Sequence, residues 1–266
     1  MFSLKRFILS LIVVSFIFSC KENDSSDNSS KITDPIQRLK EDLKNNPDSF
    51  SLAETLIEAY RNNGNYDSAI HLTDRYIQKD SGNAYFWNMK ATLYFENQDT
   101  VQAIAALKQA IDIYPLPEYL VALGTIYAEI KNEHAITIAN ELLGSNKVAS
   151  GKDAYFIKGL YYNFTGQPAT AITFLDSCLN NDYTYMYAYR EKAIAFYKLG
   201  KYEESLNVLK RAVTVQNNYD EGYYWMGKCY EKLNKIEDAR QSYQNALLYD
   251  KNFIEARDAL NHLPKN

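Results

Sequence analysis

The sequence predicts an all-α fold built from stacked helical hairpins, and two observations lead to it. The first is residues 222–250, where small and apolar residues recur at helical spacing in two sets separated by a short polar break. The sets are Tyr223, Met226, Gly227, Tyr230 and then Ala239, Tyr243, Ala246. Each set makes one stripe on an α-helix, so the segment forms two helices joined by a tight turn. The second observation is that this pattern recurs along nearly all of the chain that follows residue 33.

The recurring pattern resembles the tetratricopeptide repeat, whose signature is W-x2-L-G-x2-Y, then A-x3-F, then P. Gly227 and Ala239 occupy the small positions of that signature, where two helices cross and bulky side chains would keep the backbones apart. The resemblance implies a right-handed α-solenoid of about six helical hairpins with terminal capping helices. The predicted units are residues 50–83, 84–116, 117–151, 152–185, 186–219 and 220–253, and the caps are residues 34–47 and 254–263.

The third unit departs from the pattern. Its exit segment, residues 144–151, is longer than the register allows and lacks the usual proline. We therefore expect a loop there, and a bend or softened interface that divides the array into blocks of about residues 35–143 and 152–264.

The first residues resemble an export signal. Lys5 and Arg6 precede an uncharged, mostly apolar run at residues 7–19, which is too short to span a membrane and fits the core of a signal peptide. Ile17, Ser19 and Cys20 resemble a bacterial lipobox, although Phe18 is bulkier than usual at its position. We expect residues 1–19 to be a lipoprotein signal peptide and Cys20 to carry the lipid. The alternative is an uncleaved membrane anchor with an incidental cysteine.

Residues 20–33 are polar and predict a flexible tether after the lipidated cysteine. Lys21 follows Cys20 where an aspartate retains many lipoproteins at the inner membrane. The expected location is therefore the outer membrane, with the protein facing either the periplasm or the cell surface.

Composition and motifs give no indication of catalysis. The net charge of −4, without a long basic run, argues against nucleic-acid binding. His71, His134 and His262 lie in different units, while Cys178 and Cys229 occupy positions typical of small core residues. No phosphate-binding loop, zinc-protease or nucleophile-elbow motif is present. We expect no enzymatic activity, no cofactor and no metal.

The resemblance also implies a binding surface, because the family lines its concave face with four positions of each first helix. The first unit places Ser51, Glu54, Glu58 and Arg61 there, so the groove begins polar. Later units place Asp153, Glu221 and Glu231 at the same set of positions. The predicted partner-binding residues are Tyr85, Asn88, Thr92, Phe95, Phe156, Leu160, Asn163, Tyr187, Arg190, Ile194, Tyr197, Tyr224 and Lys228. Aromatic residues and arginine are typical of binding hot spots. The alternative is that curvature packs some of these rings onto neighbouring helices.

These features predict a lipid-anchored scaffold that binds a protein or peptide partner in the bacterial cell envelope. One alternative is a structural subunit of an outer-membrane or surface assembly, held through its convex face. A second alternative is a small-solute binding lipoprotein, which requires a deep, closed pocket.

Overall fold

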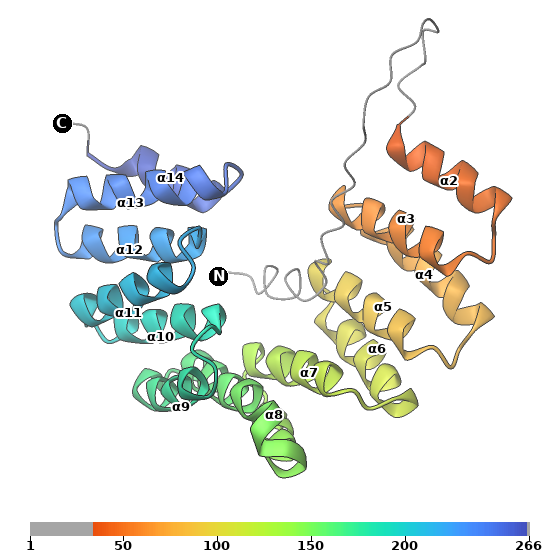
Figure 1. Cartoon of the computed structure of the whole chain (residues 1–266), viewed down its shortest axis with the longest axis horizontal. Coiled ribbons are helices and arrows are strands. Elements are labelled where there is room, and N and C mark those ends of the chain that lie inside the picture. The colour runs from red at the N-terminus through yellow and green to blue at the C-terminus, as the bar shows by residue number, and fades with distance from the viewer. Residues whose placement is uncertain (1–33, 265–266) are drawn as a thin grey trace, which may run out of the picture. The chain divides into compact units, whose positions relative to one another are not determined.

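The computed structural model describes residues 34–264, apart from the side chains of residues 145–149. Within this range every regular element is an α-helix, which confirms the predicted all-α fold class (Figure 1). The chain divides into two compact units, Met1–Tyr119 and Leu120–Asn266. The predicted signal peptide, Cys20 and the tether lie outside the described residues.

The first unit contains a capping helix and two hairpins. The cap, α2 (Pro35–Asn45), begins where the Asp34 carboxylate accepts a hydrogen bond from the Ile36 amide at 3.1 Å. The hairpins are α3 (Phe50–Asn62) with α4 (Tyr66–Lys79), and α5 (Ala84–Glu96) with α6 (Thr100–Ile113). They enclose a core that includes Leu43, Leu56, Ile57, Tyr76 and Phe86.

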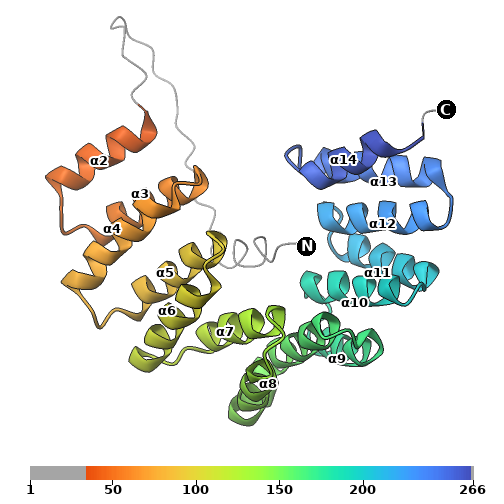
Figure 2. The same cartoon turned by 180° about the vertical axis from the view of Figure 1, so that it is seen from behind.

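The second unit contains all but the first residues of α7 (Pro117–Glu129) and the helices that follow (Figure 2). These are α8 (His134–Phe164), α9 (Pro168–Asn181), α10 (Met186–Lys198), α11 (Tyr202–Val215), α12 (Asp220–Lys232), α13 (Ile236–Tyr249) and the capping helix α14 (Ile254–His262). Each helix from α8 onward packs on the next, and α10 also packs on both α8 and α12. The helices that open successive hairpins therefore form one layer.

Within residues 34–264, the six hairpins turn through the same backbone geometry. The residue in the left-handed region is glycine at Gly64, Gly166 and Gly200, and another residue at Gln98, Lys131 and Asn234. In each turn the residue after the left-handed one donates its amide hydrogen to the carbonyl of the residue five positions before it. This bond ends the first helix and reverses the chain. The accepting carbonyls belong to Tyr60, Tyr94, Tyr127, Tyr162, Phe196 and Tyr230.

Small residues let the two helices of a hairpin approach closely, as the sequence predicts. A Cβ atom added to Gly159 would lie 2.6 Å from Cγ of Leu175, and one added to Gly227 would overlap the Tyr243 ring. Ala171 and Ala239, on the opposite helices, are fully buried. The fifth repeat, residues 186–219, has Ser205 where the signature has alanine, and the Ser205 hydroxyl donates to the Ala193 carbonyl at 2.8 Å.

The loop predicted at residues 144–151 is wrong. This segment lies inside α8, a continuous helix of 31 residues that joins the second helix of the third hairpin to the first helix of the fourth. Gly144 and Gly151 are the weak points of the segment, and glycine costs a helix only about 1 kcal/mol relative to alanine. Without a proline, that cost is too small to end the helix.

The predicted division of the array is also displaced. The compact units meet between Tyr119 and Leu120, inside α7, rather than at residues 144–151. Because α8 is continuous, the segment expected to soften the array instead ties two hairpins together.

Candidate functional site

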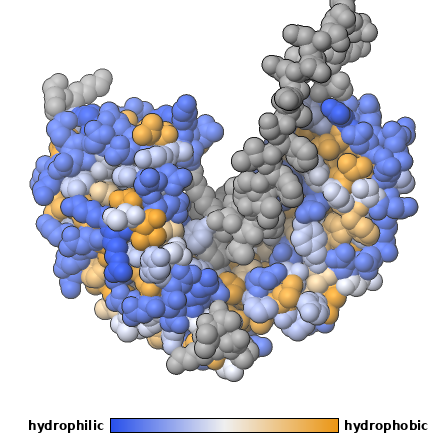
Figure 3. All heavy atoms as spheres, viewed as in Figure 1, coloured by the Kyte–Doolittle hydropathy of each residue, from blue (hydrophilic) through white to orange (hydrophobic). Residues whose placement is uncertain are grey.

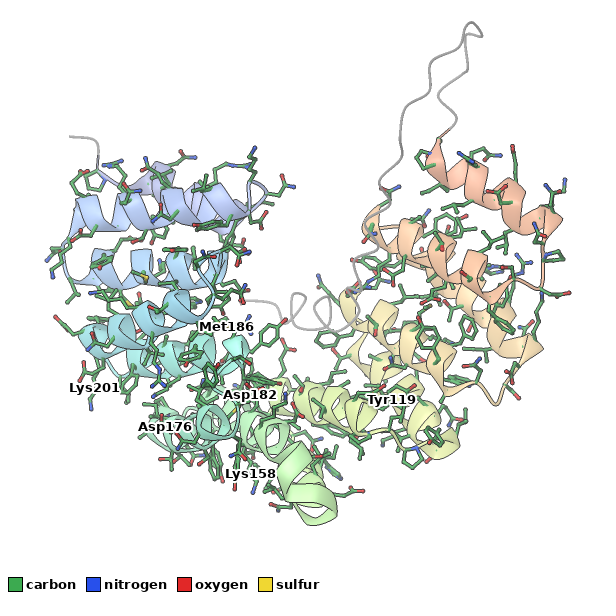
Figure 4. All side chains as sticks on the ribbon, in the orientation of Figure 1. Tyr119, Lys158, Asp176, Asp182, Met186 and Lys201 are labelled. Carbon is green, nitrogen blue, oxygen red and sulfur yellow. The ribbon has the colours of Figure 1, made fainter. Side chains whose placement is uncertain are left out.

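The first helices of the second unit present several predicted binding residues at partial exposure. Tyr187, Ile194 and Tyr197 lie on α10 and Lys228 lies on α12, and all four side chains are half-buried. In Figure 4, Asp182 and Met186 mark the two sides of the turn that leads into α10. Since α8, α10 and α12 pack side by side, these residues belong to one layer of helices.

Other predicted binding residues are buried and do not face a partner. Phe156 and Leu160 have no exposed surface, and Asn163 is only 2% exposed. The Phe156 ring lies 5.2 Å from the Tyr185 ring and 6.5 Å from the Tyr187 ring. The expectation that Phe156 is a partly exposed groove residue is therefore wrong. The packing of successive first helices covers it, which is the alternative that curvature predicts.

The rings of Tyr224 and Tyr197 also pack against neighbouring aromatic side chains. Tyr224 is 5% exposed, and its ring centroid lies 5.1 Å from that of Phe253 and 5.8 Å from that of Tyr243. Tyr197 keeps an accessible edge but packs on Tyr202 and Trp225 at 5.2 and 5.6 Å. Burial, and then the neighbouring Tyr202, raises the pKa of Tyr197 to about 12. Its hydroxyl is therefore a neutral hydrogen-bonding group at physiological pH.

Arg190 is held inside the protein and is not open to a ligand. Its Nε donates to Glu191 Oε1 at 3.1 Å, and its Nη1 donates to Glu221 Oε2 at 2.8 Å. The guanidinium also lies 5.3 Å from the centre of the Tyr187 ring. Burial alone would lower the pKa of Arg190, but the carboxylates of Glu221 and Glu191 outweigh it and raise the pKa. Arg190 is therefore bound within the chain and is not the accessible groove residue that the sequence predicts.

The buried polar groups beside Arg190 link α8, α10 and α12. Asn163, near the end of α8, donates to the Glu191 carbonyl at 2.9 Å and accepts nothing at its Oδ1 from the described residues. Lys198 Nζ donates to the Asn163 carbonyl at 2.9 Å. Burial, and then Glu191, raises the pKa of Glu129 on α7. The network sets the positions of the first helices relative to one another.

The first unit brings three predicted residues together. Tyr85, Asn88 and Thr92 on α5 line a crevice of about 10 Å³ with Glu58 and Arg61 of α3, so only a very small group fits inside. The Tyr85 hydroxyl donates to the Glu54 carboxylate, and burial followed by this bond raises the Tyr85 pKa.

The other predicted residue of α5, Phe95, is 9% exposed and is mostly buried. The predicted binding surface on α5 is therefore shallow.

The first compact unit contains a buried ion pair, Arg61–Glu96, that the sequence did not predict. Arg61 donates to both carboxylate oxygens of Glu96, with Nε to Oε2 at 2.8 Å and Nη2 to Oε1 at 2.5 Å. Glu96 and Glu129 each end the first helix of a unit and lie 33 residues apart in the sequence. That spacing is close to one repeat, and it was the available sign that glutamate recurs at this position, buried at Glu96 and half-buried at Glu129.

Other features of the described residues bear on chemistry. Cys178 and Cys229 are buried free thiols, which agrees with their interpretation as small core residues. Within residues 34–264, no group of three or more histidine, cysteine, aspartate or glutamate side chains is arranged to hold a metal. None of the helices described is both long enough and apolar enough to cross a membrane.

Comparison with known proteins identifies the repeats. Tetratricopeptide repeat models match residues 54–116 and 220–253, and a further TPR repeat model matches residues 194–234. The chain therefore contains tetratricopeptide repeats and is an all-α protein of the TPR solenoid type.

Solved structures share this fold at low sequence identity. A tetratricopeptide repeat protein from Parabacteroides merdae is 17% identical with a TM-score of 0.69, over 85% of this chain and 90% of that one. PilW, a type IV pilus biogenesis factor, is 17% identical with a TM-score of 0.60, over 79% and 97%. A chain of the APC/C hetero-tetramer Cut9–Hcn1 is 17% identical with a TM-score of 0.58, over 85% and 45%.

Proposed function

We propose that this protein is a lipid-anchored TPR scaffold that binds a protein or peptide partner in the bacterial cell envelope. The proposed partner binding rests on one observation, the layer that the first helices of successive hairpins form in the second compact unit. Tyr187 and Tyr197 on α10 are half-buried and retain accessible aromatic surface, and the half-buried Lys228 lies on α12 of the same layer. Tyrosine offers a large contact area with few bonds to immobilise, so it suits recognition of a partner segment.

The buried network beneath this layer supports the same proposal. Arg190, Glu191 and Glu221 are committed to one another, so they fix the helices without being available to a partner. A preformed surface loses little entropy on binding. Among the structures with the same fold, one is a pilus biogenesis factor and another is part of a hetero-tetramer, as their names state.

The proposed location in the cell envelope rests on the sequence of the first 33 residues. Lys5 and Arg6, the apolar run of residues 7–19 and Cys20 support export and lipidation, and the polar residues 20–33 support a tether between the lipid and α2. If Cys20 is acylated, Cys20→Ser leaves a larger precursor that incorporates no labelled fatty acid. Normal labelling of that variant would exclude the anchor.

The binding part is tested by capture from detergent-solubilised membranes, with the captured protein identified by mass. Tyr187→Ala combined with Tyr197→Ala is expected to weaken capture at least about thirtyfold, corresponding to the roughly 2 kcal/mol of a hot spot. The control is Lys210→Ala with Gln241→Ala, two exposed positions on the second helices α11 and α13. Circular dichroism melts establish that both variants remain folded. Loss of capture in the control pair alone would instead indicate an envelope subunit held through its second helices.

A further inference from the structure

We propose that the groove between α2, α3 and α4 is a second binding site, which accepts an acidic peptide segment carrying apolar side chains. The groove has a volume of about 790 Å³, within the range of ligand pockets in proteins, and lies wholly in the first compact unit. None of its residues belongs to the predicted partner-binding positions, so this site goes beyond the proposed function.

Cationic side chains form the rim of the groove. Lys40 and Lys44 lie on α2 and Arg75 lies on α4, and all three are exposed. Within residues 34–264 none of the three is ion-paired to a carboxylate. Lys40 Nζ lies 5.5 Å from the centre of the Tyr60 ring, which positions that ammonium beside the groove. The rim therefore offers three charges to an anionic ligand.

The floor of the groove is apolar. Leu43, Leu56 and Leu72 come from α2, α3 and α4, and each is 3–5% exposed. Tyr60 adds a half-buried ring beside them. An aliphatic or aromatic side chain of a ligand can contact this floor and remove further apolar surface from water. A free phosphate ion has no group that would use it.

The charge of the groove is opposite to that of the whole chain. The described lining contains three cationic side chains, Lys40, Lys44 and Arg75, and one acidic side chain, Asp67. The lining thus carries a net charge of about +2 within a chain of net charge −4. An acidic segment is attracted to this groove while the remaining surface repels it. In Figure 3, apolar residues show between hydrophilic ones on the part of the molecule that carries α2–α6.

The test measures fluorescence anisotropy of a labelled peptide in which glutamate and leucine alternate, added to the purified full-length mature chain. We expect saturable binding that weakens as salt is added. Lys44→Glu with Arg75→Glu is expected to weaken binding at least about tenfold. Asp67→Asn is expected to strengthen binding about twofold, because it removes the one repulsive carboxylate. A peptide in which serine replaces leucine is expected to bind more weakly than the leucine peptide.

The control is Lys201→Glu with Lys210→Glu, which makes the same change in net charge at two exposed positions, one just before α11 and one within it (Figure 4 labels Lys201). It is expected to leave peptide binding unchanged, and circular dichroism melts check that every variant is folded. Equal losses in both charge-reversed pairs, or equal binding of the serine peptide, would overturn the proposal. It would also be overturned if phosphatidylglycerol vesicles bind through Lys44 and Arg75 while the acidic peptide does not, because lipid headgroups would then be the occupant.

Discussion

Replacing Arg190 with methionine is expected to lower the free energy of unfolding by about 3–5 kcal/mol. Methionine keeps much of the volume of the arginine stem and removes the guanidinium. The substitution leaves two carboxylates, those of Glu191 and Glu221, only 7% and 9% exposed and without their cation. Each keeps one weaker partner, since Asn163 Nδ2 lies 3.3 Å from Glu191 and the Tyr219 hydroxyl lies 3.4 Å from Glu221. These remaining bonds do not neutralise two buried charges.

Companion variants separate charge from packing. Arg190→Lys keeps a positive charge but cannot reproduce the two bonds from Nε and Nη1, so an intermediate loss is expected. Adding Glu191→Gln and Glu221→Gln to the methionine variant removes the stranded charges and is expected to recover more than half of the loss. Urea unfolding followed by far-ultraviolet circular dichroism measures each value. A loss below about 1 kcal/mol for Arg190→Met, the scale of an exposed pair, would refute the reasoning.

Three further outcomes follow from the described residues. Phe156→Ala is expected to cost about 3–5 kcal/mol in urea unfolding because the ring is fully buried, whereas a groove residue would show little change. Gln98→Gly is expected to stabilise the protein by roughly 0.5–1 kcal/mol, since Gln98 has φ 67°, and Gly200→Ala at the equivalent turn is expected to destabilise it, both read from thermal melts. The Thr184 hydroxyl, followed by Lys152, lowers the pKa of Asp182 to about 2. The stability this contributes is present above about pH 4 and is lost as the pH falls from about 4 towards 2, so Asp182→Asn should flatten the melting temperature over that interval.

The fold could be predicted because the repeat depends on local features that any one unit displays. Gly159 and Ala171 are small where their helices cross, and Gly64, Gly166 and Gly200 occupy the turn position that needs a positive φ. These requirements act within about 34 residues of sequence, so each unit repeats the evidence. The one wrong loop, at residues 144–151, falls where the breakers are glycines without a proline.

The binding surface was predicted less well because exposure depends on the next unit. Phe156 and Tyr197 both occupy positions that the family implies for the concave face, yet one is fully buried and the other keeps an accessible edge. The difference arises from the side chains that the following first helix and its N-cap residue place against them. These are Tyr185 and Tyr187 for Phe156, and Trp225 for Tyr197. A pattern within one repeat does not contain that information. Arg190 was misassigned for the same reason, because its partner Glu221 lies 31 residues away.

The continuous helix α8 fixes the rotational phase between two hairpins of the second unit. Each residue of an α-helix advances by about 100°, so one residue inserted between 144 and 149 would turn everything that follows by about that angle around the helix axis. An insertion of four residues comes within about 40° of the original phase and lengthens the rod by about 6 Å. A loop of any length would absorb such insertions. The length of α8, rather than its composition, therefore determines which faces of α9 and α10 continue the stack.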